Sequence, residues 1–148
     1  MHKILIIEDD TDKIKRLAKY FDNADVTIKQ SFQSGVLELK EKYQDYSLLV
    51  LDMTIPLWEK GNNDLGGNYE QFGGEKVLRE MKRRKLFLPT VLFTMFDVFP
   101  TMDGTLTFQQ IDAIFKHDFA EFYLGSVLFA SDDNNWQQEM SNLISGTL

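Results

Sequence analysis

The sequence predicts an α/β protein: one domain of five β/α units, doubly wound into a three-layer sandwich around a parallel five-stranded sheet. Short aliphatic runs alternate along the chain with stretches that repeat at the helical period. The run YSLLVLD at 46–52 is apolar on both faces, which is typical of a central parallel strand. A length of 148 residues suits a single hydrophobic core.

The first half of the chain shows this alternation clearly. ILII leads the first strand, and the stretch after it places apolar side chains at offsets of three, four and seven, on one face of a helix. A short strand rich in β-branched residues and a second amphipathic helix follow. The expected elements are a strand at 3–7, a helix at 11–21, a strand at 25–29, a helix at 34–43 and the central strand at 46–52.

The second half continues the pattern with three helices and two strands. It predicts a helix at 74–84, a strand at 89–94, a helix through Phe108, Ile111, Phe115 and Phe119, a strand at 122–130, and a last helix lined by Trp136, Met140, Leu143 and Ile144. Ser131 or Asp132 is expected to cap the last helix. We expect residues 1–148 to form one domain with no further domain after this helix.

A long loop interrupts the rhythm at about 56–74 and holds five of the nine glycines. Loops of this length inside a compact domain are usually functional or mobile. Its Gly-Gly pairs do not complete a phosphate-binding loop, because no G-x-x-x-x-G-K-[ST] is present. Its acids also miss the spacing of a calcium loop. We therefore interpret it as an insertion.

Composition excludes several classes of function. The net charge of −7 argues against a nucleic-acid-binding surface, because such surfaces are usually basic. The apolar runs are too short to span a membrane, and no secretory leader fits before the first strand. The chain has no cysteine, so disulfides and thiolate metal sites are excluded. We expect a soluble, cytoplasmic protein that contacts neither nucleic acid nor membrane.

Acidic side chains gather where two predicted strands end. Glu8, Asp9 and Asp10 follow the first strand, Asp52 ends the third, and Thr94 ends the fourth. In parallel α/β sheets, ligands bind outside the carboxyl ends of the strands. Three carboxylates repel one another unless a cation shares the site, and Mg²⁺ prefers oxygen ligands. The pattern therefore predicts an Mg²⁺ pocket, with Asp10 interpreted as a helix cap.

These motifs resemble the receiver domain of response regulators in two-component signalling, the CheY-like superfamily with its flavodoxin-like fold. ILIIEDD resembles the first strand with its acid pair, LLVLDMTIP the phosphoacceptor strand, and PTVLFT the fourth strand with its switch threonine. The resemblance implies the following roles: Asp9 binds Mg²⁺ directly and Glu8 mostly through water, Asp52 binds Mg²⁺ and accepts the phosphoryl group, Thr54 offers its backbone carbonyl to the metal, Thr94 contacts the phosphoryl oxygen, and Tyr123 (or Phe122) is the switch aromatic.

The sequence departs from this family at one important position. Receiver domains normally carry a lysine near the end of the fifth strand, and here that position falls on Gly125 or Ser126. No proline follows it either. Lys60 and Lys116 are the lysines that could take the place of the missing one. Without such a cation, a phosphoryl group on Asp52 loses a charge-assisted contact.

The resemblance implies an atypical, stand-alone receiver rather than an enzyme, with at most self-phosphorylation and self-dephosphorylation. Its expected partners are a sensor histidine kinase or another phosphodonor and a separate protein effector, with a homodimer possible through the fourth helix, fifth strand and fifth helix. Phe96 and Phe99 would contribute to a docking patch near this output face. The alternative is a pseudo-receiver that binds proteins without phosphorylation. A haloacid-dehalogenase-like phosphatase is disfavoured, because Thr54 replaces the second aspartate of its motif.

Overall fold

The computed structural model describes residues 1–59 and 69–148, and its centre is a parallel sheet of five strands. The strands are β1 (Lys3–Ile7), β2 (Asp25–Lys29), β3 (Leu48–Leu51), β6 (Thr90–Thr94) and β9 (Tyr123–Leu128). They lie in the order β2-β1-β3-β6-β9, and every pairing is parallel. The predicted fold class is confirmed.

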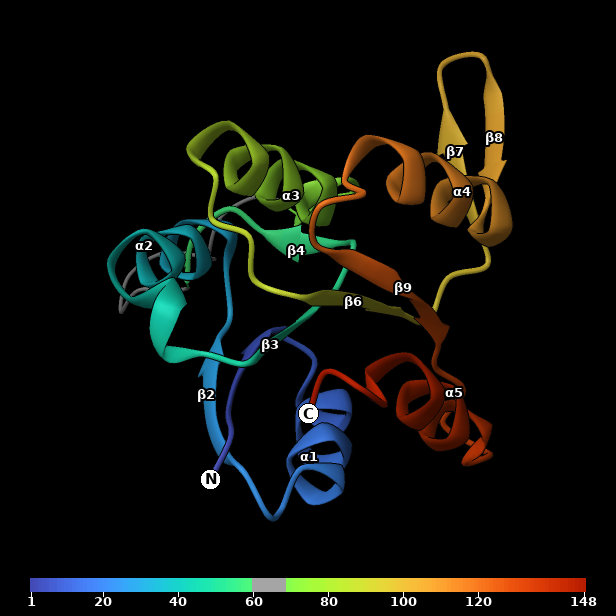
Figure 1. Ribbon diagram of the computed structural model, residues 1–148. Helices are drawn as coiled ribbons and strands as arrows, with labels where there is room; N and C mark the ends of the chain where they lie inside the picture. The colour runs from blue at the N-terminus through green and yellow to red at the C-terminus, as the bar shows by residue number, and fades with distance from the viewer. Residues whose placement is uncertain (60–68) are drawn as a thin grey trace.

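Helices cover both faces of this sheet. They are α1 (Thr11–Tyr20), α2 (Phe32–Lys42) with the short 3₁₀ helix η1 (Tyr43–Asp45) after it, α3 (Gly73–Arg84), α4 (Phe108–Asp118) and α5 (Asn135–Ile144). In Figure 1, α1 and α5 lie on one face, and α2, α3 and α4 lie on the other. This arrangement is the three-layer sandwich expected from alternating β/α units.

The sheet separates two hydrophobic cores. Along β1, Ile4 and Ile6 point into the core under α1 and α5, whereas Leu5 and Ile7 point into the core under α2, α3 and α4. This alternation follows from the two-residue period of a strand. The α1/α5 core also holds an aromatic group in which Trp136 contacts Phe93 and Phe129, at ring-centroid distances of 5.3 and 6.1 Å.

Two helix starts differ from the prediction. α2 begins at Phe32, earlier than expected, because the Ser31 hydroxyl caps it by accepting a hydrogen bond from the Ser34 N–H at 3.1 Å. The predicted cap of α5 by Ser131 or Asp132 is wrong. The N-cap is Asn134, without a side-chain bond, and the Asp133 carboxylate accepts from the Asn135 N–H at 3.0 Å. Ser131 and Asp132, the first polar residues after β9, form a turn, so α5 begins after them.

Four short strands outside the main sheet were not predicted. β4 (Ile55–Pro56) pairs with β5 (Tyr69–Glu70), so both ends of the expected 56–74 loop are ordered, and α3 already begins at Gly73. β7 (Val98–Thr101) and β8 (Gly104–Thr107) form an antiparallel hairpin between β6 and α4. In Figure 1 this hairpin projects beyond α4. Within the described part of the chain, no helix is long and apolar enough to cross a membrane.

Candidate functional site: an acid cluster at the carboxyl edge of the sheet

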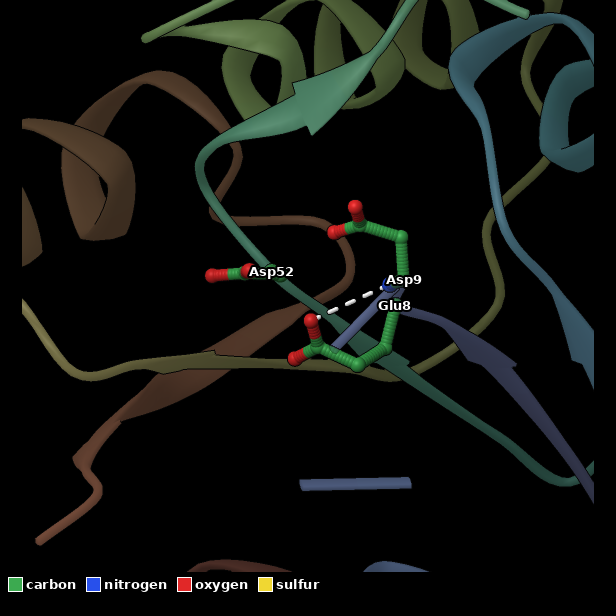
Figure 2. Close-up of side chains that lie close together, drawn as sticks. All are labelled: Glu8, Asp9 and Asp52. Carbon is green, nitrogen blue, oxygen red and sulfur yellow. Dashed lines mark hydrogen bonds between the residues drawn. The ribbon is translucent and has the colours of Figure 1, made fainter. Parts of the chain in front are cut away.

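Three carboxylates meet where β1 and β3 end. The two strands are neighbours with Ile7 opposite Leu51, and the Asp52 N–H donates to the Ile7 carbonyl at 3.0 Å. This pairing brings Glu8, Asp9 and Asp52 together, and one oxygen of each lies within 4.8 Å of the others. Figure 2 shows the three side chains directed toward a common space. The structure thus places together the acids that the sequence predicted to share a pocket.

The Glu8 carboxyl group is held in place by two backbone N–H groups. Its Oε2 accepts hydrogen bonds from the Asp9 N–H at 3.1 Å and the Asp10 N–H at 3.2 Å. The side chain is fully buried, and its Oε1 has no hydrogen-bond partner among the described residues. Buried carboxylate oxygens are costly when unmatched, so this atom favours a cation nearby.

Asp10 has the structural role predicted for it. Its Oδ2 accepts a hydrogen bond from the Lys13 N–H at 2.9 Å and caps the N-terminus of α1. The cap fixes the first turn of α1 relative to the end of β1. As a result, the next residue on the buried face of the helix, Lys13, is directed into the acid cluster.

Lys13 is the cation that the sequence prediction missed. Its Nζ lies 2.8 Å from Glu8 Oε1 and 2.9 Å from Asp52 Oδ2, and only 2% of its side chain is exposed. The contact with Asp52 is a hydrogen bond, whereas the contact with Glu8 is an ion pair without hydrogen-bond angles. Lys13 lies four residues before the buried Leu17, on the same helical face, and this spacing was the available signal.

Burial sets the protonation of this cluster. Burial, and then the negative charge of Asp52, raise the pKa of Glu8 to about 9, although Lys13 opposes the shift. Burial also raises the pKa of Asp52 above its usual range, and Lys13 again opposes it. For Lys13, burial would lower the pKa, but Asp52 and Glu8 together hold it above its usual value. Lys13 is therefore charged at neutral pH, and the two carboxyls retain a proton between them.

The Asp52 carboxylate is fixed through both of its oxygens. Oδ1 accepts from the Met53 N–H at 2.8 Å, and Oδ2 accepts from Lys13. The backbone behind it is fixed by α3, because the Gly74 N–H donates to the Met53 carbonyl at 2.7 Å. A Cβ atom at Gly74 would lie 2.5 Å from the Asp52 carbonyl oxygen, so this close approach requires glycine.

A pocket of about 380 Å³ opens in front of these groups. Its lining residues are Asp9, Asp10, Thr11, Lys13, Asp52, Thr54, Met95 and Phe96. The Thr54 hydroxyl donates to the Gln71 carbonyl at 3.1 Å, which fixes the chain just after Asp52. Thr94 ends β6 as predicted but is fully buried, and its Oγ1 accepts from the Phe96 N–H at 3.2 Å. The inserted residues 60–68, including Lys60, lie outside the described residues.

The predicted output aromatics are only partly exposed. Phe99 is buried, so its predicted place in an exposed docking patch is wrong, whereas Phe96 is 47% exposed. Tyr123 is buried under α4, and its hydroxyl donates to Asp112 Oδ1 at 2.7 Å. Ser126 also bonds to Tyr123 and to Asp112. Burial raises the pKa of Tyr123 well above its usual value. Tyr123 thus ties β9 to α4 in this structure.

β9, the last strand of the main sheet, carries no lysine or arginine toward the pocket. In the register of β6 and β9, Leu128 lies opposite Thr94, and Ser126 lies opposite Leu92. Lys116, considered as a substitute, instead pairs with Asp112 one turn earlier in α4, at 2.9 Å. Among the described residues, the ammonium group in contact with Asp52 is that of Lys13.

A doubly wound sheet in the order β2-β1-β3-β6-β9, with acids at the ends of β1 and β3, defines a receiver-like domain of the CheY-like fold. Comparison with known proteins agrees. The chain is 27% identical over 150 residues to the Detocs response regulatory protein DtcB of Enterobacter cloacae (strain JD6301), covering 97% of this chain and 98% of that protein. No protein-family model matches the chain.

Solved receiver structures share the fold. The response regulator receiver domain from Clostridium thermocellum superposes with a TM-score of 0.63 at 16% identity, covering 99% of this chain and 94% of the other. CheY in the CheX-CheY-BeF3-Mg complex from Borrelia burgdorferi gives 0.63 at 12% identity, covering 99% and 90%. The Mn²⁺-bound form of response regulator Rcp1 gives 0.62 at 15% identity, covering 98% and 93%. The resemblance to receiver domains is therefore confirmed.

The donor set suits a hard divalent cation. Glu8, Asp9 and Asp52 offer carboxylate oxygens that lie within 4.8 Å of one another. The Lys13 ammonium group already supplies one positive charge to the same acids.

Proposed function

We propose that this chain is a phosphoacceptor receiver in two-component signalling, which accepts a phosphoryl group on Asp52. The observation that carries the proposal is the Asp52 carboxylate, fixed at the end of β3, lining an open pocket and lying within 4.8 Å of two further carboxylates. Phosphoryl transfer to a carboxylate depends mainly on positioning and charge neutralisation.

Each residue of the site has a role in this proposal. An oxygen of Asp52 forms the new bond to phosphorus while the bond to the donor's leaving group breaks, and the leaving group departs with the electron pair. Bound Mg²⁺ would neutralise the oxygens of the transferred group. Asp9, Asp52 and the Thr54 carbonyl would hold the ion directly, and Glu8 mostly through water. The Thr94 hydroxyl would contact the phosphoryl oxygen after a local shift. The domain itself catalyses at most its own phosphorylation and dephosphorylation.

The partners follow from the same proposal. A sensor histidine kinase or another phosphodonor would supply the phosphoryl group, and a separate protein would read the modified state. In this proposal a homodimer through α4, β9 and α5 would be one form of the output. The exposed Met95, Phe96, Val98 and Met102, on β7 and the segments flanking it, favour protein contact. They support the alternative of a phosphorylation-independent interaction module equally well.

Intact-mass measurement after incubation with acetyl phosphate and Mg²⁺ tests the proposal. The parent is expected to gain one phosphoryl group, whereas Asp52→Asn, or the parent without Mg²⁺, gains none. Asp97→Asn is the matched control, because Asp97 is an exposed acid beyond the same edge of the sheet, and it should be modified like the parent. An unmodified parent that also fails to bind a beryllofluoride mimic with Mg²⁺ would favour the interaction module instead.

A further inference from the structure

Among the described residues, both ion-pair partners of Lys13, the buried lysine of α1, are acids. Lys13 Nζ contacts Glu8 and Asp52 at 2.8 and 2.9 Å, and the side chain is 2% exposed. Its apolar surroundings include the Phe93 ring, whose centroid lies 6.0 Å from Nζ. Buried lysines are rare unless they are paired, and here the pairing is with the acceptor itself. A helix position one turn before Leu17 would otherwise hold an apolar side chain.

The position of this charge relative to Asp52 is specific. Asp52 Oδ2 is held by Lys13, and Oδ1 is held by the Met53 N–H, so the carboxylate plane is set from both sides. The Asp10 cap holds the first turn of α1 through the Lys13 backbone N–H. Lys13 is therefore anchored at both ends, by its backbone and by its ammonium group. A surface lysine that folds over a pocket would have neither restraint.

We propose that Lys13 is the positioning residue of Asp52, a built-in cation supplied by α1 in place of a fifth-strand lysine, and that it competes with a divalent cation for the charge of Glu8 and Asp52. The inference builds on the proposed function, since it concerns the same acceptor. It adds that a positive charge already lies against Glu8 and Asp52 before any metal ion binds. Lys13 thereby weakens metal binding and orients the nucleophile.

Electrostatics gives the direction of the effect. A divalent cation bound by Glu8, Asp9 and Asp52 would lie within a few ångströms of the ammonium group, and like charges at such distances repel strongly in a buried site. Replacing Lys13 by a neutral side chain of similar length removes that repulsion. It also leaves the buried carboxyl groups of Glu8 and Asp52 without their cation, which destabilises the metal-free protein. A bound metal ion should then compensate for the loss.

Lys13→Met tests the inference without any phosphodonor. Calorimetric titration with Mg²⁺ or Mn²⁺ should show binding at least about tenfold tighter than in the parent. The rise in melting temperature on adding Mg²⁺ should also be larger in Lys13→Met than in the parent. Lys15→Met is the matched control, because it removes the same charge from an exposed position of the same helix. It should leave the metal affinity within about twofold of the parent.

A purely structural lysine would give a different result. Lys13→Met would then lower the melting temperature by the same amount with and without Mg²⁺, and metal affinity would stay unchanged, which would overturn the inference. If Lys13→Met does not fold without metal, the double variant Lys13→Met/Glu8→Gln is titrated against Glu8→Gln, and the same tightening is expected. These metal titrations need no phosphoryl transfer. If the parent fails to take up a phosphoryl group, the proposed function is wrong, but the metal titrations still decide the inference about Lys13.

Discussion

At the scale of single residues, the acid cluster follows from the sequence, and its cation does not. Strand ends alone predicted that the carboxylates of Glu8, Asp9 and Asp52 share a pocket, because β1 and β3 are neighbours in a parallel sheet. Lys13 was missed because an amphipathic pattern is read from apolar residues, and a lysine on the buried face breaks that pattern. Its role depends on a tertiary contact 39 residues away.

The raised pKa of Glu8 makes the stability of the folded protein depend on pH, in a direction that can be predicted. Its pKa is near 4.5 in the unfolded chain and about 9 in the folded protein, so between these values the folded state holds the proton more tightly. Stability therefore falls as pH rises through this interval. Glu8→Gln should remove part of the slope, so that from pH 5 to pH 8 it loses about 1 kcal/mol less stability than the parent.

Urea denaturation of metal-free protein at several pH values measures this difference. Glu121→Gln is the matched control, since Glu121 is exposed and its loss changes the net charge equally. It should keep the slope of the parent. An unchanged slope in Glu8→Gln would mean that Glu8 does not hold the proton of the cluster.

At the scale of elements, periodicity predicted the order of strands and helices but not the small antiparallel pairs. The main elements were recognisable because each buries an apolar face of its own against the sheet. β4 and β5 are two residues each, too short for any periodic signal. Within the β7–β8 hairpin Phe99 alone is buried, so the hairpin buries no continuous apolar face that a periodic pattern could reveal.

The contact between α3 and the end of β3 yields another prediction. In Gly74→Ala the new Cβ would meet the Asp52 carbonyl oxygen at 2.5 Å and the Met53 Cα at 2.9 Å, both backbone atoms that cannot rotate away. We expect a loss of about 2 kcal/mol in the free energy of unfolding, despite the better helix propensity of alanine. Chemical denaturation measures it.

Gly35→Ala is the control within another helix. Its Cβ would meet the Cδ1 atom of Ile7 at 2.6 Å, and that methyl group can move by rotation of its side chain. The expected loss is below about 1 kcal/mol. Equal losses in the two variants would show that the backbone of Asp52 yields as readily as a side chain.

At the scale of the whole molecule, stability is divided between two cores on opposite faces of the sheet. Trp136 of α5 is 1% exposed and packs among Phe93, Phe129 and Tyr20, and its Nε1–H has no hydrogen-bond partner among the described residues. Trp136→Phe thus loses apolar contact without losing a hydrogen bond. We expect a loss of about 1–2 kcal/mol in the free energy of unfolding.

Trp58→Phe is the matched control, because Trp58 is 43% exposed. Its expected change lies within about 0.5 kcal/mol of zero. Urea midpoints followed by circular dichroism, which does not depend on the tryptophans, compare the two variants. A loss at Trp58 as large as at Trp136 would contradict the division of stability between buried cores.

The position of Lys13 in α1 also has a consequence for folding. Glu8 follows β1, Lys13 lies in α1 and Asp52 follows β3, and β1 pairs directly with β3. A lysine on β9 would be far from Glu8 and Asp52 in the sequence. Here Lys13 and Asp52 are separated by 39 residues, and contacts of lower sequence separation form faster. The contacts of Lys13 with Glu8 and Asp52 can thus form within a local unit made of β1, α1 and β3.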